Sequence, residues 1–158
     1  MSTDDPDTKA LLVDDEIYQE AQRTHQLIDT LGTYLSNFHW QLYATPSFKF
    51  PVNLYRAKST VEAWVGDFGS QTYAYAAYEQ GRAGGRTHAH VLLGGLVGKI
   101  AKAHAGRLWK HGNIVIAPYD PRRGACWYVA KFPNDGDFIG NPQRVRRRGR
   151  GKKRQKGQ

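Results

Sequence analysis

Cysteines and long apolar runs are both scarce in this sequence. Cys126 is the single cysteine among 158 residues, so an internal disulfide and a zinc site made of several cysteines are both excluded. The sequence contains no stretch of about 18 apolar residues, the length that a membrane-spanning helix needs. The N-terminus is acidic, unlike the basic and then apolar start of a signal peptide. We therefore expect one soluble, cytoplasmic domain that has no membrane partner.

Acidic residues are missing from the C-terminal segment, which is strongly basic. Nine of the 23 Lys and Arg lie in residues 144–158, which leaves 14 to balance the 14 Asp and Glu of residues 1–143. A neutral body with a basic, glycine-containing tail predicts a disordered arm that binds a polyanion. The alternative is a solvated or localisation tail that adds nothing to specificity. The candidate nucleic-acid-binding residues are Arg144, Arg146, Arg147, Arg148, Arg150, Lys152, Lys153 and Arg154.

The chain divides into three regions. Residues 1–34 combine a disordered start with an accessory helix from about Lys9 to Tyr34, where apolar side chains recur at helical spacing and Gly32 interrupts or ends the pattern. Residues 35–143 form the folded domain, and residues 144–158 form the basic tail. The accessory helix either packs on the domain, which we favour, or serves dimerisation or partner docking.

The folded domain alternates strand and helix patterns. Strands are predicted over 38–44, 71–79, 87–93 and 113–117, where β-branched or aromatic residues gather. Helices are predicted over 59–68, which starts with a capping-box pattern, and over 100–110. A last helix over 122–132 follows Asp120 as its cap. The order β-α-β-β-α-β with one helix appended indicates an α+β, ferredoxin-like fold with a central antiparallel sheet.

Two histidines alternate along the predicted third strand. His88 and His90 are two residues apart, so their side chains project from one face of the strand. Glu79 ends the preceding strand, and a hairpin would set it opposite the start of the histidine strand. Two imidazoles and one carboxylate form a metal-binding set that leaves positions open for a substrate oxygen. The alternative is an exposed strand-end acid beside half-buried sheet histidines.

A tyrosine and a lysine, three residues apart on the last predicted helix, share one face of that helix. They are Tyr128 and Lys131. A phenol with a free pKa of about 10 is mostly protonated at neutral pH and therefore a poor nucleophile. A neighbouring ammonium can stabilise its phenolate. The alternative makes Tyr128 a core aromatic and Lys131 a surface residue. Tyr119 is a rival nucleophile, but it has Arg122 rather than a lysine three residues on.

Together these motifs resemble the histidine-hydrophobic-histidine (HUH) endonucleases, specifically rolling-circle replication initiators with one catalytic tyrosine. The resemblance covers roughly residues 38–132, and Tyr128 follows His90 at the spacing of an initiator tyrosine. It implies catalytic roles for Tyr128 and Lys131, and Mg²⁺ or Mn²⁺ bound by Glu79, His88 and His90. The implied substrate is single-stranded DNA at an origin stem-loop, cut with formation of a 5′-phosphotyrosine during plasmid or phage replication.

Other functions share some of these features. A single-tyrosine insertion-sequence transposase would use the same chemistry, although its tyrosine tends to lie further from the histidines. A non-catalytic module that binds single-stranded DNA or RNA on a ferredoxin-like sheet is a different class, in which the basic tail provides affinity. Host helicase and polymerase are the expected protein partners of an initiator, and the oligomeric state is open.

Overall fold

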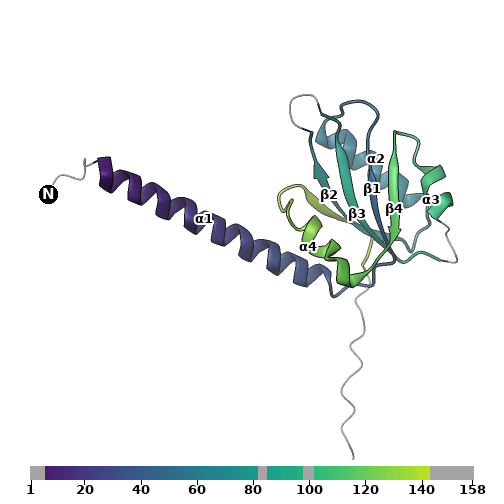
Figure 1. Cartoon of the computed structure of the whole chain (residues 1–158). Coiled ribbons are helices and arrows are strands. Elements are labelled where there is room, and N and C mark those ends of the chain that lie inside the picture. Colours follow the sequence, from purple (N-terminus) through teal and green to yellow (C-terminus); the bar gives the residue numbers. More distant parts are fainter. Residues whose placement is uncertain (1–5, 82–84, 98–101, 143–158) are drawn as a thin grey trace, which may run out of the picture.

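A computed structural model describes residues 6–81, 85–97 and 102–142. The protein belongs to the α+β class, as the sequence predicted, with a five-stranded antiparallel sheet (Figure 1). In chain order the elements are α1 (Pro6–Leu35), β1 (Leu42–Pro46), α2 (Leu54–Gly66), β2 (Tyr73–Glu79), β3 (His88–Gly94), α3 (Lys102–Leu108), β4 (Ile114–Pro118), the 3₁₀ turn η2 (Pro121–Arg123), α4 (Ala125–Val129) and β5 (Gly136–Ile139).

The strands lie in the order β4-β1-β3-β2-β5. β3 is the central strand, flanked by β1 and β2, and every neighbouring pair is antiparallel. The β2–β3 hairpin keeps one register from Tyr73 opposite Gly94 to Glu79 opposite His88. Because the period of a strand is two, this register decides which side chains of β2 and β3 share a face.

Each face of the sheet carries its own hydrophobic core. On one face α2 packs with Ala57, Val61 and Trp64 against strand residues such as Val91 and Leu93. On the other face Cys126 and Val129 of α4, with Leu35 of α1, pack against Leu92 and Tyr75. Figure 1 shows α2 behind the sheet and α4 in front of it. Since Leu92 and His90 share a face, His90 points toward the α4 side.

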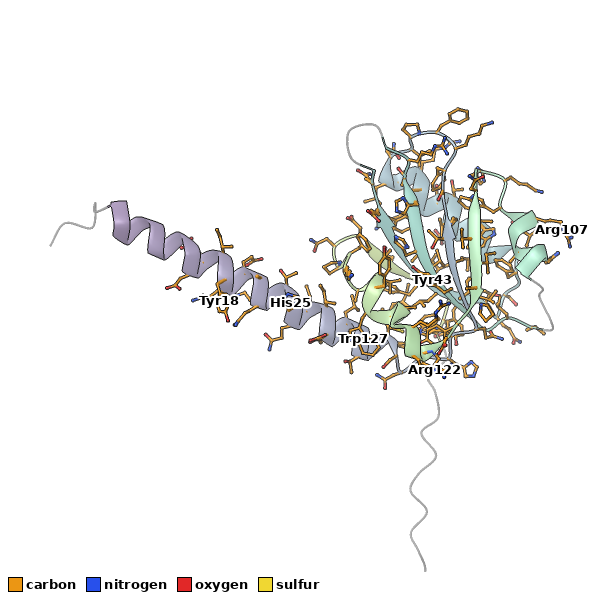
Figure 2. The ribbon with its side chains drawn as sticks, viewed as in Figure 1. Tyr18, His25, Tyr43, Arg107, Arg122 and Trp127 are labelled. Carbon is orange, nitrogen blue, oxygen red and sulfur yellow. The ribbon has the colours of Figure 1, made fainter. Side chains whose placement is uncertain are left out.

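Helix α1 contacts the domain through its C-terminal end. Figure 1 shows α1 projecting away from the sheet, and Figure 2 shows Tyr18 and His25 on its outlying part and Trp127 beside its last turns. A Cβ added at Gly32 would lie 2.6 Å from the indole of Trp127, so only glycine lets the two helices approach this closely. Within the described residues, no helix combines the length and apolar character needed to cross a bilayer.

Several predicted boundaries were wrong. The first strand begins at Leu42 rather than Phe38, and α2 begins at Leu54, with Asn53 rather than Ser59 as its cap. Asn53 is the cap because its side chain accepts a hydrogen bond from the backbone N–H of Arg56 at 2.8 Å. The accessory helix starts at Pro6, earlier than expected, and continues through Gly32 to Leu35.

The predicted helix over 122–132 is two short elements separated by Gly124. This glycine has a φ of +69°, in the left-handed region that a continuous right-handed helix cannot contain. η2 therefore ends before it and α4 begins after it, and α4 ends at Val129. None of the four predicted strands lies after residue 132, where the structure has the edge strand β5.

Candidate metal centre

Glu79, His88 and His90 meet at the turn end of the β2–β3 hairpin, where β2 ends and β3 begins. Glu79 lies directly across from His88, and Ala77 lies across from His90, so the three side chains share one face. The Nε2 atom of His88 lies 2.8 Å from Oε2 of Glu79, and the Nε2 atom of His90 lies 3.3 Å from the same oxygen. The hairpin register thus brings together the three residues that the sequence singled out.

The second nitrogen of each imidazole faces an oxygen atom. Nδ1 of His90 lies 3.0 Å from the hydroxyl of Tyr43, and Nδ1 of His88 lies 3.3 Å from the backbone carbonyl of Arg86. The Arg86 carbonyl and the Glu79 carboxylate can both only accept, so a neutral His88 donates to one of them. In the tautomer whose Nδ1–H donates to the carbonyl, Nε2 keeps a lone pair. If His90 takes the same tautomer, both Nε2 lone pairs point at one carboxylate oxygen. Such an arrangement needs a proton or a cation between the groups.

Glu79 and His90 differ in exposure, and the pKa of each is lowered. Burial lowers the pKa of His90, whose side chain is 6% exposed, although its hydrogen bond with Glu79 acts in the opposite direction. Burial would raise the pKa of Glu79, but hydrogen bonds with His90 and His88 outweigh that effect and leave it lowered. Near neutral pH the site therefore contains an ionised carboxylate and a neutral His90, which are the ligand forms that a cation requires.

The spacing of the donor atoms fits a small divalent cation. One ligand atom from each of Glu79, His88 and His90 lies within 4.8 Å of the other two. Neighbouring ligands around octahedral Mg²⁺, with bonds of about 2.1 Å, are about 3 Å apart. Two of the three donor separations, 2.8 Å and 3.3 Å, are close to this spacing. Three ligands on one side would leave positions open for water or a phosphate oxygen.

Tyr128 lies against the cluster, on the same side of the sheet. Its ring meets the ring of His90 edge to face, with centroids 4.8 Å apart and an interplanar angle of 79°. The residue is 40% exposed, so it is not a sealed core aromatic. Among the described residues its hydroxyl has no hydrogen-bond partner. Nζ of Lys131 lies over its ring, 5.0 Å from the centroid, so the two residues stay adjacent although α4 ends between them.

Sequence reasoning missed two aromatic neighbours of His90. The ring of Phe132 stacks on the His90 imidazole, with centroids 5.5 Å apart and an interplanar angle of 15°. The hydroxyl of Tyr43 contacts Nδ1 of the same imidazole. Tyr43, Arg123 and Tyr128 also line a pocket of about 310 Å³ beside the cluster, together with Ala117, Pro118, Asp120 and Ala125. No local pattern marks these residues, because β1 and α4 reach the site only through tertiary packing.

The rival residues lie elsewhere or are already engaged. The hydroxyl of Tyr119 pairs with Sγ of Cys126 at 3.3 Å, and burial raises its pKa, so it is poorly suited to form a phenolate. His39 is exposed, and its carbonyl accepts a hydrogen bond from Tyr73, at the opposite end of β2 from Glu79. The basic residues from Arg144 to Arg154 lie outside the described residues.

Comparison with protein-family models, with curated proteins and with solved structures finds no significant match to this chain.

Proposed function

We propose that this protein is a metal-dependent endonuclease and strand transferase that nicks and rejoins single-stranded DNA at a replication origin. In this proposal it starts rolling-circle replication of a plasmid or phage, as HUH initiators do. The observation that carries the proposal is the contact between Tyr128 and His90. A partly exposed phenol without a described hydrogen-bond partner lies 4.8 Å, ring to ring, from a residue of a two-histidine, one-carboxylate cluster.

The topology supports the same class. The segment β4-β1-β3-β2 of the sheet is the strand order that βαββαβ connections give in a ferredoxin-like fold, and the cluster lies on its central strand. β5 extends the sheet beyond β2, at the edge away from β1. The alternation of β3 explains its histidine-apolar-histidine pattern. Ala89 points into the core on the α2 side, while His88 and His90 on either side of it face α4.

Glu79, His88 and His90 would hold the metal, which we expect to be Mg²⁺ or Mn²⁺. When bound, such an ion polarises a phosphoryl oxygen and offsets the charge that develops during displacement at phosphorus. The chain itself prepares the ligands. The Arg86 carbonyl faces Nδ1 of His88 and favours the tautomer whose Nε2 can bind a metal. The Tyr43 hydroxyl contacts Nδ1 of His90, and Phe132 stacks on the same ring, so together they hold its orientation.

Tyr128 is the proposed nucleophile. Its phenol loses its proton to solvent, and the phenolate oxygen attacks the scissile phosphorus while the bond from phosphorus to the 3′ oxygen breaks. The 3′ oxygen takes a proton and leaves as a hydroxyl, and the 5′-phosphate stays esterified to Tyr128. Lys131, whose ammonium lies over the phenol ring, favours the phenolate electrostatically. Joining is the reverse attack by a DNA 3′-hydroxyl.

The pocket beside Tyr128 is where we expect a nucleotide next to the cut. Its lining is mostly apolar, with Tyr43 and the exposed Arg123 among the residues. Arg123 can contact a phosphate, and an aromatic wall can take a base. The expected DNA is therefore single-stranded at this point, since a paired and stacked base cannot turn into a pocket. Host helicase and polymerase would supply unwinding and synthesis.

A covalent-adduct assay tests the proposal. The protein is incubated with Mn²⁺ and 3′-labelled single-stranded oligonucleotides, taken from the non-coding DNA around the gene and from a random pool. We expect a denaturation-resistant protein–DNA adduct that EDTA abolishes, that Tyr128→Phe lacks and that Tyr119→Phe retains. Absence of any adduct from the parent protein, or an equal yield from Tyr128→Phe, contradicts the proposal.

A further inference from the structure

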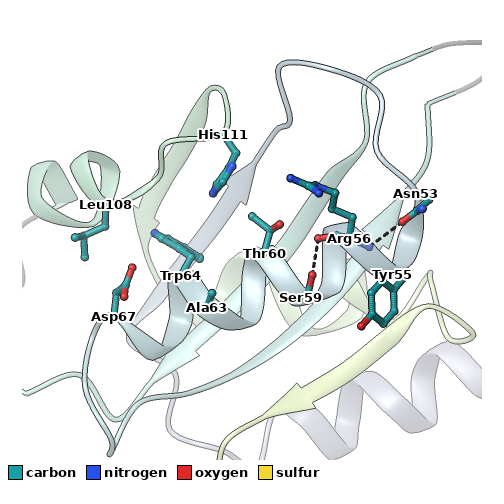
Figure 3. A pocket seen from close by; sticks show the side chains of 10 residues that line it. All are labelled: Asn53, Tyr55, Arg56, Ser59, Thr60, Ala63, Trp64, Asp67, Leu108 and His111. Carbon is teal, nitrogen blue, oxygen red and sulfur yellow. Dashed lines mark hydrogen bonds between the residues drawn. The ribbon is translucent and has the colours of Figure 1, made fainter.

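A groove runs along α2, on the other face of the sheet. It is formed by two adjoining hollows of about 520 Å³ and 360 Å³ that share Arg56, Thr60 and His111. We call it the α2 groove. Its walls are α2, the segment 48–52 after β1, and the segment 108–111, which runs from the last residue of α3 toward β4. Figure 3 shows Arg56 and Thr60 on the side of α2 that faces His111.

The α2 groove is lined by cations. Lys49, Arg56 and Lys110 are exposed and line it, and His111 adds a titratable ring. Among the described residues none of the three cations forms an ion pair. Asp67 is the one acidic side chain of the lining, and Figure 3 shows it at the Leu108 end, away from Arg56. Unpaired cations gathered along one groove favour a polyanionic ligand.

An exposed aromatic ring lies in the same groove. Phe50 is 68% exposed and lines the hollow with Lys49, whose Nζ lies 5.5 Å from its ring centroid. The ring of His111 is itself held in place by Trp109, with centroids 5.2 Å apart. An exposed phenyl ring leaves its face free to stack on a base. Aromatic rings among cations are the combination with which proteins bind the bases and phosphates of single-stranded nucleic acid.

The α2 groove starts beside the metal centre. The hydroxyl of Thr87 donates to the carbonyl of Val52 at 3.0 Å, and Phe48 N–H donates to the carbonyl of Thr87 at 3.0 Å. Thr87 immediately precedes His88, and Ser47 forms an isolated bridge with His88. The wall of the groove is therefore one residue away from a proposed metal ligand, although the two sites lie on opposite faces of the sheet.

We propose that the α2 groove binds the single-stranded DNA that continues from the phosphate at the metal centre. Arg56, Lys110 and Lys49 contact phosphates, and Phe50 stacks on a base. A path from one face of the sheet to the other turns sharply around the end of β3. Duplex DNA, with a persistence length of about 150 base pairs, resists such a turn, whereas a single strand follows it. The identity of the ligand as the nicked strand depends on the proposed function.

Direct binding in EDTA tests the groove without any cleavage. Fluorescence anisotropy of a labelled oligothymidylate is compared between the parent and the full-length double variant Arg56→Ala, Lys110→Ala. We expect affinity to fall about tenfold or more. The slope of log K against log salt should fall by about 1.4, since each phosphate contact on a single strand contributes about 0.7. The matched control is Arg23→Ala, Lys58→Ala, which removes two cations from α1 and from the far flank of α2, where Lys58 pairs with Asp137.

A second pair of variants tests the stacking. Phe50→Ala removes the exposed ring of the groove, and Tyr18→Ala removes a ring that is 64% exposed on α1. We expect only Phe50→Ala to weaken binding, by about fivefold or more, and ultraviolet cross-linking should attach DNA to a peptide containing Phe50. Equal affinity of groove and control variants, or stronger binding of duplex than of single strand, overturns the proposal. If the parent binds DNA but forms no adduct, and the groove variants lose that binding, the groove proposal is supported and the nuclease proposal is rejected.

Discussion

The rings of His90 and Tyr128 meet edge to face, with centroids 4.8 Å apart. His90 comes from the central strand and Tyr128 from α4, so this contact joins a proposed metal ligand to the proposed nucleophile. Phe132 stacks on the same imidazole at 5.5 Å. Both aromatic residues belong to the segment that follows Gly124. A small movement of α4 therefore changes the position of the phenol and the packing of the ligand together.

Loss of one imidazole should abolish tight metal binding. His88→Ala leaves one histidine and one carboxylate, too few to hold Mn²⁺ against water. We expect the affinity, measured by isothermal titration calorimetry, to fall further than the roughly 10- to 100-fold caused by removing a residue that only supports a ligand. His104→Ala, an exposed histidine on α3, should bind as the parent does. Unchanged affinity of His88→Ala rejects the assigned ligand set.

Tyr43→Phe should weaken the metal site without removing a ligand. The change deletes the hydroxyl that lies 3.0 Å from Nδ1 of His90 and keeps the ring. We expect Mn²⁺ affinity to fall about 10- to 100-fold, because the tautomer and orientation of the imidazole lose their support. Calorimetry measures the effect, and Tyr55→Phe, on a residue 83% exposed, is the control. Equal affinity of the two variants shows that Tyr43 does not position His90.

The meeting of Glu79, His88 and His90 could be predicted from the sequence because its geometry is local. Glu79, His88 and His90 belong to two strands of one hairpin, and strand alternation with a hairpin register decides which side chains meet. The position of Tyr128 depended on the resemblance to a family. Its proximity to His90 follows from the packing of α4 on the sheet, which no spacing in the sequence encodes.

The contribution of Tyr43 could not be predicted in the same way. β1 and β3 pair across a long separation in the chain, and Tyr43 opposite Leu92 is one of several registers that the aromatic segment allows. β5 escaped prediction because it is four residues long and follows turn-forming residues. The continuous helix predicted through Gly124 was wrong, because glycine readily takes the left-handed φ that the structure shows there.

Acid should destabilise the metal-free protein through the cluster. The pKa of His90 is lowered by burial, so the folded state binds fewer protons than the unfolded state, and its contribution is complete above the unfolded value of 6.5. The pKa of Glu79 is also lowered, from 4.5, so its contribution too is lost as pH falls. The free energy of unfolding of the parent, measured by urea denaturation, should decrease as the pH is lowered from about 7.5 to about 4. Below about pH 6.5 the free energy of unfolding should fall less steeply with decreasing pH in His90→Asn than in the parent. An identical pH dependence of the two proteins would contradict the role given to His90.

Deletion of residues 144–158 should weaken DNA binding and leave the chemistry in place. The segment contains nine of the 23 Lys and Arg and no acid, so its contribution is electrostatic. We expect the truncated protein to show a flatter dependence of log K on log salt, by about 0.7 for each phosphate of single-stranded DNA that the tail neutralises in the parent. Its maximal adduct yield at saturating DNA should equal that of the parent. An unchanged salt slope means that the tail does not contact DNA.

Two glycine substitutions should differ in their effect on stability. Gly32→Ala places a methyl group 2.6 Å from the indole of Trp127, so α1 must shift away from α4. We expect a loss of about 1–3 kcal/mol in the free energy of unfolding, as for other overpacked sites. Gly66→Ala is the matched control, because a Cβ there meets nothing within 4 Å. It should be neutral or stabilise the protein by up to about 1 kcal/mol. Urea denaturation with far-ultraviolet circular dichroism measures both. Equal stabilities would mean that α1 and α4 are not in close contact, and α4 would then lose the support that holds Tyr128 against His90.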